Sequence, residues 1–420
     1  MKNLSKKNSY KFFLQSYFLI FSTELMFALL NPSYVQLFFD DSSPFFTILQ
    51  NNSSKSFYYG LFMTGGQIAS LFANLILGFL SDKIGRKPFI ILSILSIVIA
   101  SLSGILGAKH ELIMLFIWGY ILGQLLYSMF PIIIASVTTA AYNEKNKLIL
   151  IGFLQFFTGL AFIIGPLLGS LIIDIFKNFI FSYYITLIFS CFLLFGISIF
   201  YFPKESLSMN EKGFVKHYSV KNTILMLKNS RILILTVLLI LDQIAWGTFF
   251  QFIQPFVKLK LAFSVKQIGY LVSFIGFSLT LSSLILLPIL QRYIKQKNIF
   301  YISLIFMIIG ILGILSIFFL PENSSCKSFI LYLMTFFIAS GDVIIFSLLV
   351  VSFSDMIPVS YQGMISGFLY TLSKGFGWSI SAFLGSFFMN LDIILVMVFP
   401  LLILIVCFIF FAKFSNQIYY

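Results

Sequence analysis

The sequence predicts an all-α membrane protein whose twelve transmembrane helices form two pseudo-symmetric six-helix bundles. Three observations predict this fold. The chain is 60% hydrophobic and only 10% charged, whereas roughly a quarter of the residues of a soluble domain are charged. Its 420 residues have room for about twelve spans, since each needs about 20 apolar residues plus a turn. A hydrophilic stretch near the middle divides the predicted spans into six plus six.

The composition excludes a soluble enzyme. The mean hydropathy is +1.02, and no compact core of this size hides that much apolar surface from water. The net charge is +13, which we assign to loops at an anionic membrane surface rather than to nucleic-acid binding. The three cysteines are scattered and odd in number, so they predict no disulfide framework.

The predicted spans are separated by polar, charged or Pro/Gly positions. They cover residues 11–39, 57–80, 89–108, 112–141, 148–174, 179–202, 232–257, 268–290, 299–320, 329–355, 363–389 and 391–412. The first span follows several lysines, as in a signal peptide, but its apolar run is too long and no small-residue cleavage site follows. We therefore expect it to be an uncleaved anchor.

The domain organisation predicted is a bundle over residues 1–202, a linker over 203–231 and a second bundle over 232–420. The halves repeat short patterns at nearly the same offset. Gly60 near the start of the second span corresponds to Gly269 near the start of the eighth, and Ser170 in the fifth corresponds to Ser386 in the eleventh. Such a duplication is typical of transporters, whose site lies between the repeats.

The orientation follows from the loop charges. The termini and the loops on their side hold 19 of the 27 Lys and Arg residues, and the opposite loops hold 7. Positive charge concentrates on the cytoplasmic side of a membrane. We therefore expect both termini in the cytoplasm and a multi-pass protein of the cell membrane.

The loop between spans two and three carries a dense motif over residues 78–88. Gly78 would admit a close helix, Gly85 would allow a tight turn, and Asp82 and Arg86 could pair at the cytoplasmic mouth. The motif resembles the signature loop of the major facilitator superfamily. The resemblance implies the twelve-helix, two-bundle fold, a gating role for this loop, and a central cavity lined by spans one, seven, ten and eleven.

A second motif lies in span five, where Gly165, Pro166 and Gly169 would form a kinked, closely packed seam. It is similar to the Gly-Pro motif of the drug/proton antiporter branch of that superfamily, although Ser170 stands where a further Gly is usual. That branch also usually carries an Arg in span four, and here span four has no basic residue. A generic kink therefore remains an alternative interpretation.

Four ionisable residues fall well inside predicted spans: Glu24, Asp242, Asp342 and Lys374. Charges at the bilayer centre are costly, so such residues usually face a cavity or a partner. Counted along the helices, all four lie at about mid-depth, and the family resemblance puts them around one cavity. We expect a polar cluster that carries protons and contacts substrate, with Glu24 and Asp242 as the preferred proton carriers. A fixed ion pair of Lys374 with one acid is the alternative.

Neutral polar and aromatic side chains near these charges are weaker candidates for pocket contacts, because such residues more often pack or join helices. They are Gln243, Trp246, Gln251, Trp378, Gln124 and Tyr127.

The function predicted is secondary active transport by alternating access, most consistent with proton-coupled efflux of a small amphipathic or cationic compound. The missing span-four Arg keeps open a proton-coupled importer of a small metabolite such as an amino acid or organic acid. A non-transporting membrane receptor is the alternative from another class. There is no phosphate-binding Gly-rich loop and no metal-ligand spacing, so we expect no cofactor, no metal and no enzymatic activity. We also expect the protein to be a monomer.

Overall fold

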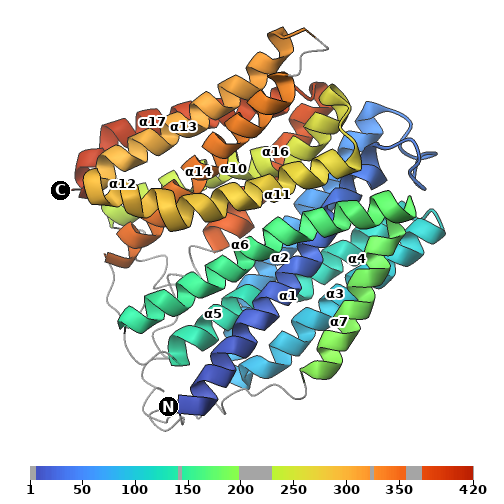
Figure 1. Cartoon of the computed structure of the whole chain (residues 1–420), viewed down its shortest axis with the longest axis horizontal. Coiled ribbons are helices and arrows are strands. Elements are labelled where there is room, and N and C mark those ends of the chain that lie inside the picture. Colours follow the sequence, from blue (N-terminus) through green and yellow to red (C-terminus); the bar gives the residue numbers. More distant parts are fainter. Residues whose placement is uncertain (1–5, 141–143, 198–228, 322–325, 356–370, 420) are drawn as a thin grey trace.

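The computed structural model describes residues 6–140, 144–197, 229–321, 326–355 and 371–419, and within them it is a helical protein of two bundles (Figure 1). The N-terminal bundle consists of α1 (Lys6–Phe39), α2 (Asn52–Ile84), α3 (Arg86–Lys109), α4 (Ile113–Leu126), α5 (Met129–Ala140), α6 (Glu144–Phe176) and α7 (Ile180–Gly196).

The C-terminal bundle begins within the last residues of the predicted linker, most of which lies outside the described residues. It consists of α10 (Ser230–Leu261), α11 (Val265–Leu281), the π-helix η2 (Ser282–Leu286), α12 (Leu287–Tyr293), α13 (Gln296–Ser316), the 3₁₀ helix η3 (Ile317–Phe319), α14 (Cys326–Asp355), the π-helix η5 (Thr371–Gly377), α16 (Trp378–Leu391) and α17 (Leu395–Tyr419).

The membrane-spanning segments agree with the predicted order. Within the described ranges, ten segments are long and apolar enough to cross a membrane, and Ile180–Gly196 is a shorter apolar helix in the position of predicted span six. The described part of predicted span eleven is η5 followed by α16. Predicted span four differs, because it is two helices, α4 and α5, with a break between them.

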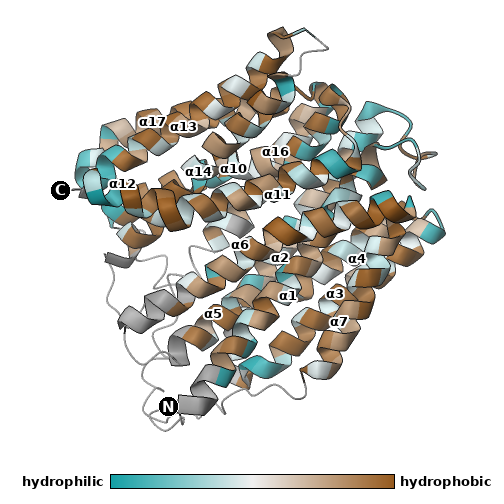
Figure 2. Cartoon of the chain, viewed as in Figure 1, coloured by the Kyte–Doolittle hydropathy of each residue, from teal (hydrophilic) through white to brown (hydrophobic). Residues whose placement is uncertain are grey.

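The outer surface of the helices suits a lipid solvent. Large apolar side chains stand exposed on it, including Phe192 (71%), Phe195 (80%) and Phe319 (91%). Figure 2 shows hydrophobic residues along the length of the helices and hydrophilic ones mainly toward loops and helix ends. Soluble monomers rarely expose so much contiguous apolar surface, so these faces are covered by the bilayer.

Both termini lie at one end of the bundles (Figure 1). We call the opposite end, formed by residues 40–51, 110–112, 177–179, 262–264 and 392–394, the distal end. There the two bundles are joined by polar contacts. Lys258 Nζ lies 2.6 Å from Asp40 Oδ2, and Lys266 Nζ lies 3.6 Å from Asp174 Oδ2.

Close packing of small residues also joins the bundles. A Cβ at Gly159 of α6 would be 2.5 Å from the Oγ1 of Thr280 in α11, and one at Gly276 of α11 would be 2.8 Å from the backbone carbon of Phe162 in α6. Such contacts let the helix backbones approach closely and lie along a seam. The seam runs between α6, which is predicted span five, and α11, which belongs to predicted span eight.

Candidate functional site

Three polar side chains of α10 and α14 meet inside the C-terminal bundle. The amide nitrogen of Gln243 donates hydrogen bonds to Oδ2 of Asp242 at 3.0 Å and to Oδ1 of Asp342 at 3.1 Å. The packing of α14 on α10 brings Asp342 against the two α10 residues. Asp242 is 0% exposed and Asp342 6%. The acids predicted in spans seven and ten therefore share one hydrogen-bond donor.

Asp242 and Asp342 also lie within hydrogen-bonding reach of each other. Carboxylates in contact repel, and burial removes the water that would stabilise their charges, so such a pair retains at least one proton. Oδ1 of Asp242 is buried and has no hydrogen-bond partner within the described parts of the chain. A second proton can therefore bind to this oxygen without displacing an existing hydrogen bond.

Trp378, the first residue of α16, is connected to this acid pair. Its indole Nε1 donates to Oε1 of Gln243 at 3.2 Å. About two turns further along α10, the amide of Gln251 donates to the Oγ of Ser381 at 2.8 Å and to the carbonyl of Trp378 at 3.3 Å. The start of α16 is thus fastened to α10 at two levels.

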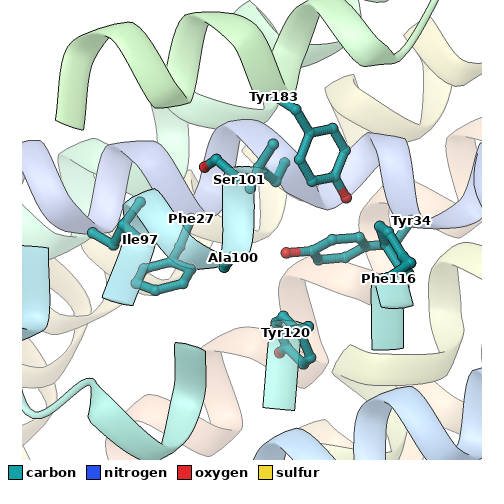
Figure 3. A pocket seen from close by; sticks show the side chains of 9 residues that line it. Phe27, Tyr34, Ile97, Ala100, Ser101, Phe116, Tyr120 and Tyr183 are labelled. Carbon is teal, nitrogen blue, oxygen red and sulfur yellow. The ribbon is translucent and has the colours of Figure 1, made fainter. Parts of the chain in front are cut away.

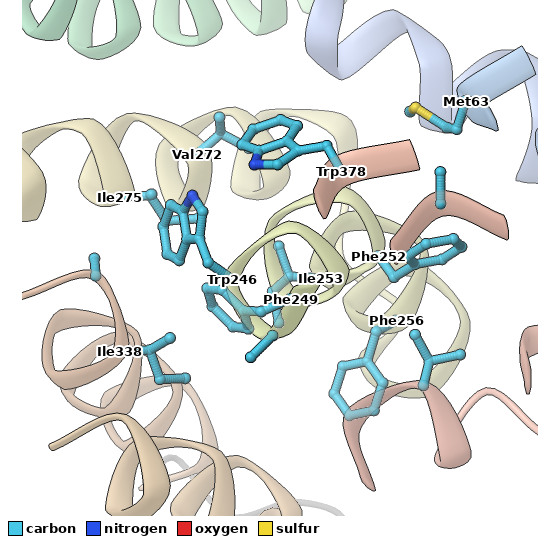
Figure 4. Packing of buried hydrophobic residues seen from close by; sticks show 14 of the residues in the cluster. Met63, Trp246, Phe249, Phe252, Ile253, Phe256, Val272, Ile275, Ile338 and Trp378 are labelled. Carbon is cyan, nitrogen blue, oxygen red and sulfur yellow. The ribbon is translucent and has the colours of Figure 1, made fainter. Parts of the chain in front are cut away.

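Trp246 lies close by, but its side chain packs against other aromatic rings. It is 4% exposed, and its ring lies 5.7 Å from that of Phe249 and 5.6 Å from that of Phe250. Figure 4 shows Trp246 and Trp378 among buried hydrophobic side chains of α10, α11 and α16. Among the candidates for pocket contacts, Gln243 and Trp378 belong to the hydrogen-bond network of the two acids. Trp246 lies in the hydrophobic core.

Glu24 lies on α1, in the N-terminal bundle. The hydroxyl of Tyr127 donates to Oε1 of Glu24 at 3.2 Å, and Glu24 is half-buried. Nearby, Gln124 hydrogen-bonds the hydroxyl of Tyr120. Two of the four charges predicted to form one layer, Asp242 and Asp342, are thus in contact within the C-terminal bundle, whereas the meeting of Glu24 and Lys374 with them stays a prediction.

The break in span four lies at Tyr127 and Ser128, beside Glu24. Two features of the sequence cause it. Pro131 has no N–H and so cannot donate to the carbonyl of Tyr127, four residues earlier. The N–H of Ser128 donates instead to the Oγ of Ser93 in α3 at 3.0 Å. Interrupted helices in transporters are typical of ion and substrate sites, which makes the surroundings of Glu24 a second candidate region.

A small pocket lies inside the N-terminal bundle (Figure 3). Tyr34, Ser101, Tyr120 and Tyr183 are among its lining residues, and its space admits about one water molecule. It is too small for an organic substrate. The hydroxyls of Tyr183 and Ser101 are buried there without a hydrogen-bond partner among the described residues.

The loop motif between α2 and α3 is described in part. Gly85 has a φ of +108°, a conformation that disfavours side chains, and Arg86 begins α3. Among the described atoms, nothing lies within 4 Å of a Cβ built at Gly78, so the close helix approach expected there stays a prediction. The side chains of Asp82 and Lys374 lie outside the described residues, so their pairings remain predictions.

The Gly-Pro motif of α6 faces α1. A Cβ at Gly165 would be 2.5 Å from the Cβ of Ala28, and one at Gly169 would collide with the backbone carbonyl oxygen of Leu29. Pro166 lies within α6, which continues past it. In the described part of the chain, no group of three or more His, Cys, Asp or Glu side chains is arranged to hold a metal ion.

A two-bundle array of apolar spans with polar groups buried inside defines a multi-pass membrane transporter, not an enzyme. The chain belongs to the Major Facilitator Superfamily, whose family model matches residues 16–382. A stretch of 125 residues is 32% identical to the class H tetracycline resistance protein of Pasteurella multocida. That match spans only 30% of either protein.

Solved structures of transporters share the fold. The nucleoside transporter NupG superposes with a TM-score of 0.73 at 16% identity, over 96% of this chain and 99% of that one. A D-xylose-proton symporter gives 0.70 at 12% identity, over 98% and 97%. The human organic anion transporter MFSD10 gives 0.64 at 14%, over 96% and 99%. At these identities the likeness establishes the fold alone.

Proposed function

We propose that the protein is a proton-coupled secondary transporter that exports a small amphipathic or cationic compound across the cell membrane. The observation that carries the proposal is the contact between the buried carboxyls of Asp242 and Asp342 under one shared donor, Gln243. A buried pair that holds one proton and has an oxygen available for a second is suited to loading and releasing a proton.

Glu24 has a different role in this proposal. It is half-buried and lies beside the break in span four, in the other bundle from the acid pair. A carboxylate there attracts a cationic group of the substrate, while the acid pair carries the proton. The proton and the substrate then compete through carboxyls in different bundles, and they do not compete for one shared carboxylate.

The direction of transport is proposed on the partial similarity to the tetracycline resistance protein. Import is the second candidate, because the structural relatives include a nucleoside transporter and a D-xylose-proton symporter. A proteoliposome experiment distinguishes them. Under a proton gradient directed into the vesicle, an exporter of the antiport type expels preloaded ethidium or tetracycline, whereas a symporter accumulates external uridine or D-xylose.

The coupling itself is tested with Asp342→Asn and Asp242→Asn in the same vesicles. Each variant should lose gradient-driven flux and keep exchange of labelled for unlabelled substrate, because exchange needs no net proton movement. Asp392→Asn, an exposed acid at the distal end, is the matched control and should behave like the native protein. If both acid variants retain gradient-driven flux, the pair is not the coupling site; binding without flux in the native protein would indicate a receptor.

The orientation proposed puts both termini in the cytoplasm, supported by the loop charges. Cys326 is exposed at the start of α14, on the distal side. A membrane-impermeant maleimide added to intact cells should label it. Gln417→Cys in a Cys326→Ser background should react only after the cells are opened, and the reverse pattern would overturn the orientation. The same purified protein should elute at the mass of a monomer.

A further inference from the structure

The start of α16 links the acid pair to the boundary between the bundles. Trp378 binds Gln243 by its indole N–H, and Gln243 in turn binds both carboxyls. Within the same helix, Ser386 lies against Gly60 of α2, in the other bundle, where a Cβ would be 2.5 Å from the Cβ of Ser386. One rigid helix therefore contacts the proton-binding region at one end and the opposite bundle further along.

The amide of Gln243 is sensitive to the protonation state of the pair. With one carboxyl ionised, its two N–H groups both donate to carboxyl oxygens and its Oε1 remains available to Trp378. A second proton turns the last carboxylate into a neutral acid, which brings an O–H donor and weakens the charge-assisted bonds from the amide. The weakened bonds hold the Gln243 amide less firmly, and with it the Oε1 that accepts the indole N–H of Trp378.

We propose that Gln243 and Trp378 form the link through which the protonation of Asp242 and Asp342 moves α16 relative to α2; this inference rests on the proposed proton coupling. Protonation of the pair releases the indole, and loss of the proton restores its hydrogen bond. Gln243 and Trp378 act as positioning residues, because their effect passes through the acids and through α16.

The backbone before Trp378 is built to allow such a movement. The π-helix η5 immediately precedes it, and π-helical turns are less tightly bonded than α-helical ones and cluster at functional sites. Gly377 lies against Gln243, where a Cβ would be 2.9 Å from the Cβ of Gln243. This segment also contacts the other bundle, because a Cβ at Gly375 would be 2.9 Å from the Cβ of Leu71 in α2.

A second connection holds the same end of α16 and passes to the same helix. The amide of Gln251 binds Ser381 and the carbonyl of Trp378, and the carbonyl of Gln251 accepts the hydroxyl of Tyr59 of α2 at 2.7 Å. A movement of α16 relative to α10 therefore also affects the hydrogen bond between Gln251 and Tyr59 of α2.

Other titratable groups surround the acid pair. The thiol of Cys407 on α17 is close enough to Asp242 for their charges to interact. Lys374 belongs to η5, which packs on α10, and its side chain lies outside the described residues. Glu24 of α1, which also packs on α10, has Tyr127 of its own bundle as its hydrogen-bond partner. The pH test below therefore includes Cys407→Ser.

The experiment compares Trp378→Phe and Gln243→Met with the native protein and with Trp118→Phe. Trp118 lies on the outer face of α4 and is 60% exposed, so its variant makes the same chemical change away from the link. For each protein, ethidium or tetracycline flux is measured under a proton gradient and as exchange without a gradient. The distance between spin labels at Ser53 and Asn390, on either side of the α2/α16 boundary, is followed against pH.

The expected result is a selective loss of coupling. Trp378→Phe and Gln243→Met should lower the ratio of gradient-driven flux to exchange by roughly three- to tenfold, the effect of one hydrogen bond. Their label distance should lose the pH dependence that the native protein, Trp118→Phe and Cys407→Ser retain. Gln243→Met tests the link if its unfolding temperature is near that of the native protein. If it is not, Trp378→Phe, which keeps an aromatic ring in place, is the deciding variant.

Two results would overturn the link. The first is a native flux ratio with a native pH profile in Trp378→Phe; the second is an equal loss in Cys407→Ser, which would assign the pH response to that thiol. Failure of the proposed function looks different. In that case the native protein itself shows no gradient-driven flux, whatever the behaviour of the variants.

Discussion

Gly60 of α2 lies against Ser386 of α16, across the boundary between the bundles. The same relationship recurs between Gly269 of α11 and Ser170 of α6, where a Cβ at Gly269 would collide with the side chain of Ser170. These are the residues that repeat between the halves of the sequence. Each repeat therefore contributes the Gly of one contact and the Ser of the other, as a two-fold arrangement of duplicated bundles requires.

Enlarging Gly60 should open the distal end. Gly60→Ala places a methyl group 2.5 Å from the Cβ of Ser386, which cannot rotate away, so α2 and α16 must separate. We expect a longer distance between spin labels at Ser53 and Asn390 in protein whose exposed Cys191 and Cys326 are replaced. Gly196→Ala is the control, because no atom of the described residues lies within 4 Å of a Cβ there. An unchanged distance in Gly60→Ala would show that this contact does not keep the bundles together.

The ion pair of Asp40 and Lys258 joins the end of α1 to the end of α10. Asp40→Lys and Lys258→Asp should each lengthen the same label distance, because each places like charges together at the distal end. The double exchange should return the distance most of the way to the native value. If the double variant resembles the singles, the effect comes from lost packing rather than from charge.

The contribution of Asp40 should depend on pH. Partial burial raises the pKa of Asp40, but hydrogen bonds from Lys258 and Ser42 lower it more, so the pKa lies below its usual value. A carboxyl with a lowered pKa stabilises the folded state above the ordinary pKa and loses this effect as the pH falls through the lowered one. The difference in unfolding temperature between native protein and Asp40→Asn, measured in detergent, should be constant above about pH 5 and shrink below about pH 4. A difference that grows toward acid would contradict this assignment.

Much of the fold is readable from the sequence because the bilayer imposes strong rules. Long apolar runs have to be helices, and the described spans follow the predicted order. The break at Ser128 escaped the prediction, although Pro131 gave a signal, because the hydrogen bond that replaces the helical one comes from Ser93, distant in sequence. The π-helix η5 gave no signal at all, since apolar periodicity does not distinguish it from an α-helix.

The acids of the candidate site could be chosen from the sequence, but the hydrogen bonds that connect them could not. Intramembrane charges are costly and therefore conspicuous, which identified Glu24, Asp242 and Asp342. Their grouping depends on helix rotation and packing, which the sequence alone does not specify. Gln243 ranked among weak candidates because neutral amides often join helices; its position directly after Asp242 is the signal that could have raised its rank.

Glu24 and the acid pair should separate in their kinetic effects. Glu24→Gln removes the charge that we assign to binding a cationic group, so the KM for ethidium should rise about tenfold while the response to a proton gradient persists, since one charge-assisted bond contributes about 1.5–3 kcal/mol. Tyr127→Phe keeps the charge and should have a smaller effect. Loss of gradient-driven flux in Glu24→Gln with an unchanged KM would instead make Glu24 a proton carrier.

Removing the hydroxyl of Tyr183 should leave stability nearly unchanged. The hydroxyl is buried with no hydrogen-bond partner in the described structure, so Tyr183→Phe loses no such bond while the ring contacts remain. We expect a change in the free energy of unfolding within about 1 kcal/mol. Tyr59→Phe is the comparison, because its hydroxyl binds the carbonyl of Gln251 at 2.7 Å and its loss leaves that carbonyl without the donor. An equal loss in both variants would mean that the Tyr183 hydroxyl has a partner in solution.

The seam between α1 and α6 should be the least tolerant of added volume. In Gly169→Ala the new methyl group collides with the backbone carbonyl oxygen of Leu29, which no rotamer change can relieve, so the helices must move apart at a cost of about 1–3 kcal/mol. Gly152→Ala, in the same helix, meets no described atom within 4 Å and should be neutral or slightly stabilising, because alanine favours a helix over glycine. Thermal unfolding of both variants in detergent measures the difference. A Gly169→Ala protein as stable as Gly152→Ala would mean that α1 and α6 are further apart in the membrane than this packing requires.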